Sequence, residues 1–116
     1  MVEKILSKHF AERTEPIQFL VVHCFALTVE KMIQVLDELG VSTHYIIDTN
    51  GRVIQCVPED KVAWHAGKSF WRGVSGLNKY SIGINARLPF NTNSEKMVDQ
   101  IKSTISDYKI KIDEIL

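Results

Sequence analysis

The most constraining feature of this chain is a nearly continuous apolar segment, rich in β-branched side chains, at residues 17–23. A strand with one solvated face alternates apolar and polar side chains, whereas this segment contains almost no polar positions. It is therefore predicted to be the central strand of a sheet that is covered on both faces. The length of 116 residues predicts that this sheet belongs to one domain spanning residues 1–116.

A helix is predicted to follow this strand over residues 29–39. Thr28 has the side chain of an N-cap, Glu30 suits the positive end of a helix dipole, and Gly40 suits a C-terminal stop. Between the two ends, apolar side chains recur at helical spacing: Val29, Met32, Ile33, Leu36 and Leu39. The pattern predicts an amphipathic helix with one apolar face.

Three more strands are predicted at residues 44–48, 52–57 and 80–85. The first two are separated by Asn50 and Gly51, a dipeptide typical of a β-hairpin because both residues tolerate positive φ. The third carries alternating isoleucines, which is typical of a strand with one buried face. These strands are expected to join the central strand in one sheet.

Two stretches complete the predicted fold. Residues 58–79 have no regular period and are predicted to form a long irregular loop, a kind of segment that often carries function. Ser94 is predicted to cap a closing helix that reaches Tyr108. The whole pattern indicates an α/β fold with a mixed central sheet of about four or more strands and flanking helices.

Composition excludes several classes of protein. The chain has 14 basic and 14 acidic residues, so it lacks the excess charge of a nucleic-acid coat or a polybasic membrane binder. No apolar run approaches the roughly 20 residues of a transmembrane helix, and residues 1–16 lack the apolar core of a signal peptide. Two cysteines are too few for a disulfide framework. We therefore expect a cytoplasmic protein that binds neither nucleic acid nor membrane.

The charge is distributed unevenly along the chain. Residues 1–50 contain four basic and seven acidic side chains, whereas residues 51–90 contain six basic and two acidic ones. A local basic surface can attract an anionic ligand. Scattered lysines on a solvated surface would give the same pattern, so charge alone leaves both interpretations open.

Two of the four histidines are candidate functional residues. His23 lies at the end of the predicted central strand, where a rigid sheet can hold a side chain while the next loop leaves it accessible. His65 lies between small residues and beside Trp64, which can anchor a loop or stack on a ligand. Either histidine can instead be a hydrogen-bonded structural residue. His44 is expected on the first hairpin strand, on the same surface as His23 or on the opposite one.

Several motifs, taken in order, resemble the type 2 N-acetylmuramoyl-L-alanine amidases. They lie between residues 16 and 84 and are Val21-Val22-His23-Cys24, Ser42-Thr43-His44-Tyr45-Ile46-Ile47-Asp48, Ile54-Gln55-Cys56-Val57-Pro58-Glu59, Ala63-Trp64-His65-Ala66-Gly67-Lys68-Ser69 and Asn78-Lys79-Tyr80-Ser81-Ile82-Gly83-Ile84. The family includes bacterial enzymes that recycle cell-wall fragments, amidase-type phage lysozymes and peptidoglycan recognition proteins. Five motifs in the family's order are far more specific than any one of them.

The resemblance implies a zinc-dependent hydrolase of peptidoglycan or muropeptides. Such enzymes cleave the amide between N-acetylmuramic acid and L-alanine. His23 would be the first zinc ligand, and the metal would activate a water and polarise the scissile carbonyl. The residues expected to contact the substrate are Trp64, His65, Ala66, Lys68 and Asn78. A positive field from Lys68 and its basic neighbours Arg72 and Lys79 would suit the carboxylates of a stem peptide.

The sequence departs from the family's pattern at two places. The family completes its zinc site with a second histidine and an aspartate or cysteine beyond the closing helix, whereas here no histidine follows His65 and the chain ends where that segment would begin. Asn85 occupies the position of a catalytic glutamate, and a carboxamide cannot act as a general base. His44 or His65 would have to join His23 in an improvised zinc site.

Three hypotheses follow. The first is an amidase with impaired or absent catalysis, lacking the family's C-terminal segment. The second is a non-catalytic module that binds muropeptides without cleaving them. The third is a decayed fragment with neither activity. An amidase should bind zinc and release the stem peptide, a binding module should leave the muropeptide intact, and a decayed fragment should do neither.

Overall fold

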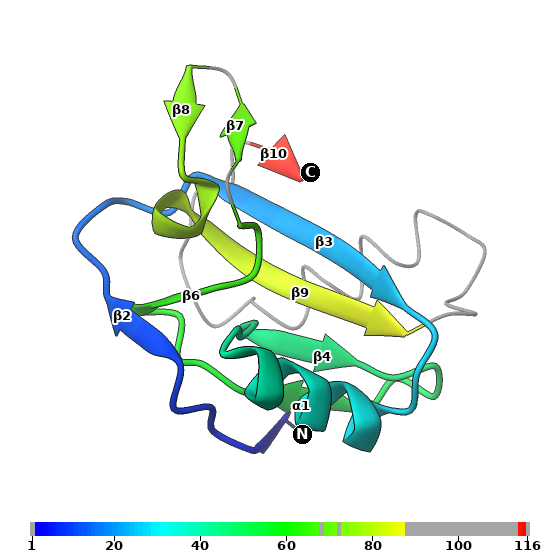
Figure 1. Cartoon of the computed structure of the whole chain (residues 1–116). Helices are drawn as coiled ribbons and strands as arrows, with labels where there is room; N and C mark the ends of the chain where they lie inside the picture. Colours follow the sequence, from blue (N-terminus) through cyan, green and yellow to red (C-terminus); the bar gives the residue numbers. More distant parts are fainter. Residues whose placement is uncertain (1, 68, 72, 88–113, 116) are drawn as a thin grey trace.

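A computed structural model describes residues 2–67, 69–71, 73–87 and 114–115 of the chain (Figure 1). Its central feature is a mixed six-stranded sheet with the strand order β1-β5-β4-β9-β3-β10. The strands are β1 (Val2–Lys4), β3 (Phe19–Phe25), β4 (Tyr45–Ile47), β5 (Val53–Gln55), β9 (Ser81–Arg87) and β10 (Glu114–Ile115). The predicted α/β fold with a mixed central sheet is confirmed.

The two longest strands, β3 and β9, lie side by side and in parallel at the centre of the sheet (Figure 1). Their register pairs Phe19 with Ser81 and continues without interruption to Phe25 and Arg87. The predicted central strand is therefore confirmed, although it begins at Phe19 and continues past His23. Because the register pairs His23 with Asn85, parallel pleating places these two side chains on the same face of the sheet.

Helix α1 (Val29–Leu39) covers one face of the sheet (Figure 1). The Thr28 hydroxyl accepts a hydrogen bond from the backbone N–H of Lys31 at 3.2 Å, and Gly40 ends the helix with a φ of 68°. The backbone N–H of Val41 then donates to the carbonyl of Leu36 at 3.0 Å, which satisfies a carbonyl that the helix leaves unpaired. Both predicted ends of the helix are confirmed.

The apolar face of α1 packs against a cluster on the sheet. The cluster contains Phe25, Val29, Ile46, Ile54 and Cys56, with Met32, Ile33 and Leu36 packed beside it. Leu39 shares the helical spacing of these residues but remains 69% exposed, because it lies in the last turn, past the edge of the cluster. Of the five side chains at this spacing, Leu39 is the one that does not pack in the cluster.

The hairpin predicted at Asn50 and Gly51 joins β4 to the antiparallel β5. Asp48 and Arg52 close the loop through a 2.9 Å backbone hydrogen bond from the N–H of Asp48 to the carbonyl of Arg52. Gly51 adopts a positive φ of 87°, and its N–H donates to the carbonyl of Asp48. The connection is thus a three-residue loop with glycine in the left-handed position rather than a two-residue turn.

The segment predicted as an irregular loop contains short regular elements, so that prediction is wrong in part. It includes β6 (Lys61–Ala63), the small hairpin of β7 (Phe70–Trp71) and β8 (Val74–Ser75), and the 3₁₀ helix η1 (Leu77–Tyr80). Strand β6 pairs with β2 (Phe10–Glu12), about 50 residues earlier in the chain. Strands of two or three residues are too short to show a hydrophobic period in the sequence. Strand β6 also depends on a partner, β2, that lies far away in the sequence.

The second face of the sheet carries another apolar cluster. It contains Leu20, Tyr45, Ile47, Ile82, Ile84 and Ala86. The closing helix predicted after Ser94 lies outside the described residues, so it stays a prediction, as does the single domain over residues 1–116. Within the described part of the chain, no helix has the length and apolar character needed to cross a bilayer.

Replacing Thr28 by Ala should lower the free energy of unfolding by about 1 kcal/mol, because the backbone N–H of Lys31 loses its acceptor. Thr28→Ser is the matched control, since it retains the hydroxyl. Chemical denaturation of the three proteins measures the difference. Equal losses in the Ala and Ser variants would contradict a capping role for the hydroxyl.

Candidate functional site

The guanidinium of Arg13 links the backbone segments on which the candidate site is built. It donates hydrogen bonds of 2.8–3.0 Å to four backbone carbonyls, those of Glu59, Lys61, Lys79 and Ser81. These carbonyls lie in β6, at the end of η1, at the start of β9 and in the turn before β6. Arg13 therefore ties the N-terminal segment to three elements that are far away in the sequence.

His44 lies beside Arg13 and is fully buried. Its Nδ1 accepts a 2.9 Å hydrogen bond from the backbone N–H of Gly83, so its Nε2 carries the proton and donates to the carbonyl of Lys61 at 2.8 Å. Burial lowers the pKa of His44 to about 4, and the positive charge of Arg13 acts in the same direction. Because both ring nitrogens are engaged, neither is free to bind a metal beside His23, so of the two histidines considered for an improvised zinc site only His65 remains.

The imidazole of His65 lies directly on the backbone of Gly83 in the middle of β9. A Cβ atom placed on Gly83 would lie 2.4 Å from Cγ of His65, far inside van der Waals contact. Glycine at this position of the strand is therefore required for the ring to approach the sheet. Burial lowers the pKa of His65 to about 3, and His44, His23 and Arg13 add to the effect, so the imidazole is neutral.

His23, on β3, meets His65 at the same face of the sheet. Its Nε2 lies 3.3 Å from Nδ1 of His65, and the two rings have an edge-to-face arrangement with centroids 5.5 Å apart. Burial lowers the pKa of the half-buried His23 below its ordinary value. A neutral imidazole retains one lone pair, which is the form that binds a metal ion.

Asn85 lies next to His23 on the adjacent strand. Its side-chain nitrogen is 3.9 Å from Sδ of Met32, and its buried Oδ1 has no hydrogen-bond partner among the described residues. An unpaired buried carbonyl oxygen is unfavourable unless a ligand or water satisfies it. The structure thus leaves an acceptor beside His23, and a carboxamide there can hold a hydrogen bond but cannot take up a proton.

The loop that carries Trp64 and His65 is held by two polar side chains. Oδ1 of Asn78 accepts hydrogen bonds from the backbone N–H groups of His65 and Ala66, at 3.1 and 2.8 Å. The hydroxyl oxygen of Ser42 accepts from the backbone N–H of Trp64 at 3.0 Å. Asn78 therefore positions the loop, while its predicted contact with a substrate stays a prediction.

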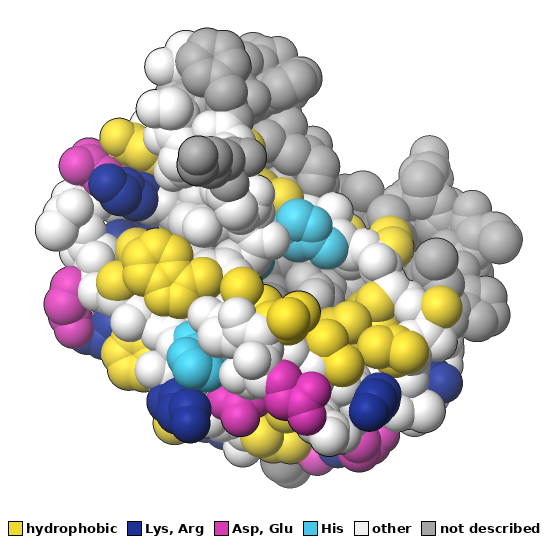
Figure 2. Space-filling view, viewed as in Figure 1, with side chains coloured by type: hydrophobic (Ala, Val, Ile, Leu, Met, Phe, Trp, Pro, Cys, Tyr) yellow, Lys and Arg dark blue, Asp and Glu magenta, His cyan; other side chains and the backbone are white. Residues whose placement is uncertain are grey.

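A cavity of about 300 Å³ joins these residues. It is lined by His23, Met32, Val35, Leu36, Leu39, Val41, Ser42, Trp64, His65, Gly67 and Asn85. Two central strands, one face of α1 and the loop after β6 thus contribute to one cavity, and the exposed Leu39 belongs to its wall. Figure 2 shows histidine atoms at the surface with hydrophobic side chains nearby.

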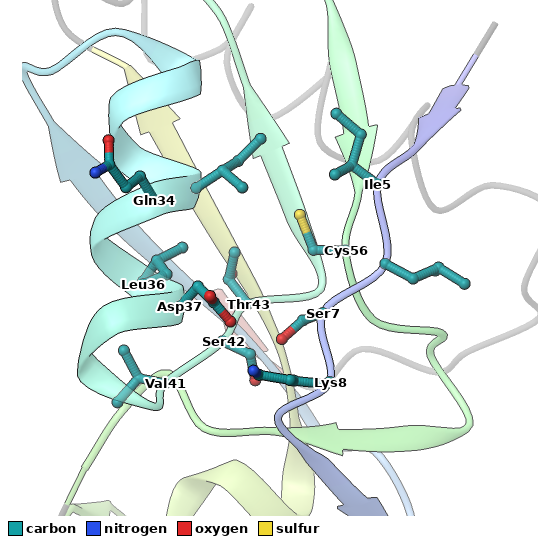
Figure 3. Close-up of a pocket in the computed structure, with 12 residues that line it drawn as sticks. Ile5, Ser7, Lys8, Gln34, Leu36, Asp37, Val41, Ser42, Thr43 and Cys56 are labelled. Atoms are coloured by element: carbon teal, nitrogen blue, oxygen red, sulfur yellow. The ribbon is translucent and has the colours of Figure 1, made fainter.

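A second cavity, of about 360 Å³, lies between α1 and the N-terminal segment (Figure 3). Residues on its wall include Ile5, Ser7, Lys8 and Asp37, together with Cys56, whose pKa burial raises to about 11. None of the predicted site residues lines this cavity. Although this second cavity is larger, the side chains suited to catalysis or metal binding lie in the cavity lined by His23 and His65, which we call the histidine cavity.

The predicted site residues therefore fall into three groups. His23, Trp64, His65 and Asn85 line one cavity, whereas Ala66 packs beside the cluster of Phe19, Val21 and Leu77, and Asn78 supports the loop. Lys68 and Arg72 lie outside the described residues, and Lys79 is exposed on η1. Sequence reasoning missed the roles of Arg13 and Gly83, because each depends on contacts with distant segments.

The described residues fit part of a zinc site. His23 presents a neutral imidazole to the cavity, and Asn85 leaves a buried oxygen beside it. Among the residues that the structure describes, no three His, Cys, Asp or Glu side chains meet in an arrangement that could hold a metal ion. His23 thus qualifies as one ligand, and the described residues do not complete a set of three.

Comparison with known proteins identifies the family. Residues 13–113 match the model of the N-acetylmuramoyl-L-alanine amidase family. The chain belongs to this family. It is 43% identical over 75 residues to the N-acetylmuramoyl-L-alanine amidase AmiD of Escherichia coli, an alignment that covers 59% of this chain and 27% of AmiD.

Two further comparisons also match this chain to amidases. The 1,6-anhydro-N-acetylmuramyl-L-alanine amidase AmpD of Haemophilus influenzae is 31% identical over 103 residues, covering 70% of this chain and 56% of AmpD. A crystal structure of an AmpD derivative superposes with a TM-score of 0.75 at 25% identity, covering 98% of this chain and 79% of that one. The chain thus spans about a quarter of AmiD and about half of this AmpD.

A solved complex provides a third comparison. The structure of E. coli AmiD with the substrate anhydro-N-acetylmuramic acid-L-Ala-D-γ-Glu-L-Lys has a TM-score of 0.64 and 28% identity, covering 90% of this chain and 55% of AmiD. The substrate in that complex belongs to AmiD.

Replacing Gly83 by Ala should cost about 1–3 kcal/mol of stability, because the new methyl group displaces the imidazole of His65. In a His65→Ala background the same substitution should cost much less, since the ring is absent. A double-mutant cycle by chemical denaturation measures this coupling. Equal costs in the two backgrounds would contradict the close packing.

The buried His44 predicts a pH dependence of stability. Its folded-state pKa of about 4 lies below the ordinary value of 6.5, so neutral His44 stabilises the fold above pH 6.5 and this contribution is lost as the pH falls toward 4. The loss should approach about 1 kcal/mol per pH unit over that window. NMR titration should show the His44 ring still neutral at pH 5.5, and a midpoint near 6.5 would refute this.

Proposed function

We propose that this chain acts on muropeptides as a zinc-dependent amidase, cleaving the amide between N-acetylmuramic acid and L-alanine. The observation that carries the proposal is the cavity in which His23 and Asn85, from neighbouring central strands, meet Trp64 and His65 from the loop after β6. Family membership supports the choice of substrate. A cytoplasmic location is part of the same proposal.

The cavity offers suitable chemistry for a muropeptide. Trp64 is 38% exposed, so its ring presents an apolar surface on which a sugar or lactyl group can pack. Leu39, Val41 and Met32 extend the apolar wall, while His23 and Asn85 provide polar atoms at the sheet. A ligand whose apolar side packs on this wall and whose amide group meets the polar atoms would fit the cavity.

The metal would be held in part by His23. When bound, zinc lowers the pKa of a coordinated water and polarises a carbonyl oxygen. The neutral imidazole of His23 is suited to bind it, and the β3–β9 pairing fixes this side chain relative to Asn85. The other ligands expected from the resemblance have no counterpart among the described residues.

Asn85 limits the rate in this proposal. Its side chain can accept or donate a hydrogen bond at the reacting amide but cannot remove a proton from an attacking water. Hydrolysis is therefore expected to be slow. This same residue favours the second candidate function, a module that binds muropeptides and leaves them intact.

The substitution Asn85→Glu should accelerate cleavage at least tenfold, because a carboxylate at this position supplies the missing general base, a contribution worth roughly 10²–10⁴ in other enzymes. Anhydro-N-acetylmuramic acid-L-Ala-D-γ-Glu-L-Lys is the substrate, and mass spectrometry of the released peptide is the measurement. Asn85→Gln is the matched control, since glutamine has the same side-chain length as glutamate but cannot act as an acid or a base.

Further variants separate the candidate functions. His23→Ala should abolish cleavage and reduce zinc binding, because the proposed metal ligand is removed. If neither the natural chain nor the Asn85→Glu variant cleaves the peptide while both bind it, the chain is a binding module and the amidase proposal fails. If the natural chain does not bind the peptide, a decayed fragment is the remaining interpretation.

A further inference from the structure

A chain of hydrogen bonds ends at the His23–His65 pair and begins at the carbonyl of Leu77. This carbonyl can only accept, so the hydroxyl of Ser81, 2.6 Å away, must donate its proton to it. Oγ of Ser81 then acts as the acceptor for Nε2 of His65 at 2.9 Å. His65 is thereby fixed with its proton on Nε2.

The direction of the next hydrogen bond follows from this assignment. A neutral His65 with its proton on Nε2 has a lone pair on Nδ1, the atom that faces Nε2 of His23 at 3.3 Å. Nε2 of His23 must therefore be the donor. The lone pair of His23 is left on Nδ1, which has no hydrogen-bond partner among the residues that the structure describes.

The surroundings leave little freedom for another arrangement. His44 cannot exchange roles with His23, because Gly83 and Lys61 engage both of its ring nitrogens. The His65 ring is confined because it packs on the backbone of Gly83 and because Asn78 holds the loop to which His65 belongs. Ser81 is completely buried, so no solvent water competes for its hydroxyl.

We propose that Ser81 and His65 are positioning residues that fix His23 as the Nε2–H tautomer and leave its Nδ1 as the only basic atom for a ligand. Histidines that bind metals commonly donate their other ring N–H to a partner that sets the tautomer and the ring orientation. Here that partner is a second histidine. The tautomer belongs to the metal-free protein, and only its use in zinc binding rests on the proposed function.

The direct test is ¹⁵N NMR of the metal-free chain with labelled histidines. The spectrum should show His23 protonated at Nε2, with a scalar coupling across the hydrogen bond between this nitrogen and Nδ1 of His65. A folded but merely packed pair of rings would give no such coupling. Protonation of His23 at Nδ1, or absence of the coupling, would overturn the proposal.

Two variants of His65 test its consequence for zinc. His65→Asn retains an acceptor oxygen near the place of Nδ1, whereas His65→Leu removes it. Zinc titration should give an affinity for the Leu variant 10–100-fold below that of the natural chain, with most of the loss restored by Asn. Equal affinities for the natural chain and the Leu variant would contradict a positioning role.

A Ser81→Ala variant tests the other end of the relay. It removes the acceptor for Nε2 of His65, so the coupling to His23 should weaken and both histidines should populate two tautomers. A shared metal ion is the competing arrangement. If zinc removes the proton from Nε2 of His23 and abolishes its coupling to Nδ1 of His65, both atoms bind the metal and the relay is refuted. Failure of amidase activity alone would leave the tautomer result intact.

Discussion

The close approach of the His65 ring to the backbone of Gly83 is the contact on which the candidate site depends. A single methyl group on that strand would occupy the space of the imidazole. The contact brings a loop residue to the centre of the sheet, where it meets His23 on β3. Without it, the loop residue His65 would not reach His23 on the sheet.

Distant segments hold this arrangement together. Arg13 donates hydrogen bonds to the carbonyls of four residues. The backbone N–H of Gly83 donates to Nδ1 of His44, and the carbonyl of Gly83 accepts from the backbone N–H of His44. The backbone held in this way supports two further neutral histidines, His65 and His23, each with the proton on Nε2. Desolvation keeps them neutral, and fixed acceptors decide where the proton lies. A histidine that is to bind a metal ion benefits from both properties.

Local patterns in the sequence predicted much of the fold. Thr28 and Gly40 marked the ends of α1, Gly51 marked the hairpin, and the apolar segment at the centre predicted β3, because each signal is contained within a few residues. The role of Gly83 and the four carbonyl contacts of Arg13 could not be predicted, since they arise from elements up to 68 residues apart. His23 and His65 were recognised as candidates, but their mutual hydrogen bond depends on the loop of His65 reaching Gly83 on β9.

The place where a muropeptide binds distinguishes the two cavities. Titration of the metal-free chain with anhydro-N-acetylmuramic acid-L-Ala-D-γ-Glu-L-Lys, followed by amide NMR, reports this residue by residue. We expect shifts centred on His23, Trp64, His65 and Asn85, the residues of the histidine cavity. Shifts centred instead on Ser7, Lys8 and Asp37, at the larger cavity beside the N-terminal segment, would contradict this expectation.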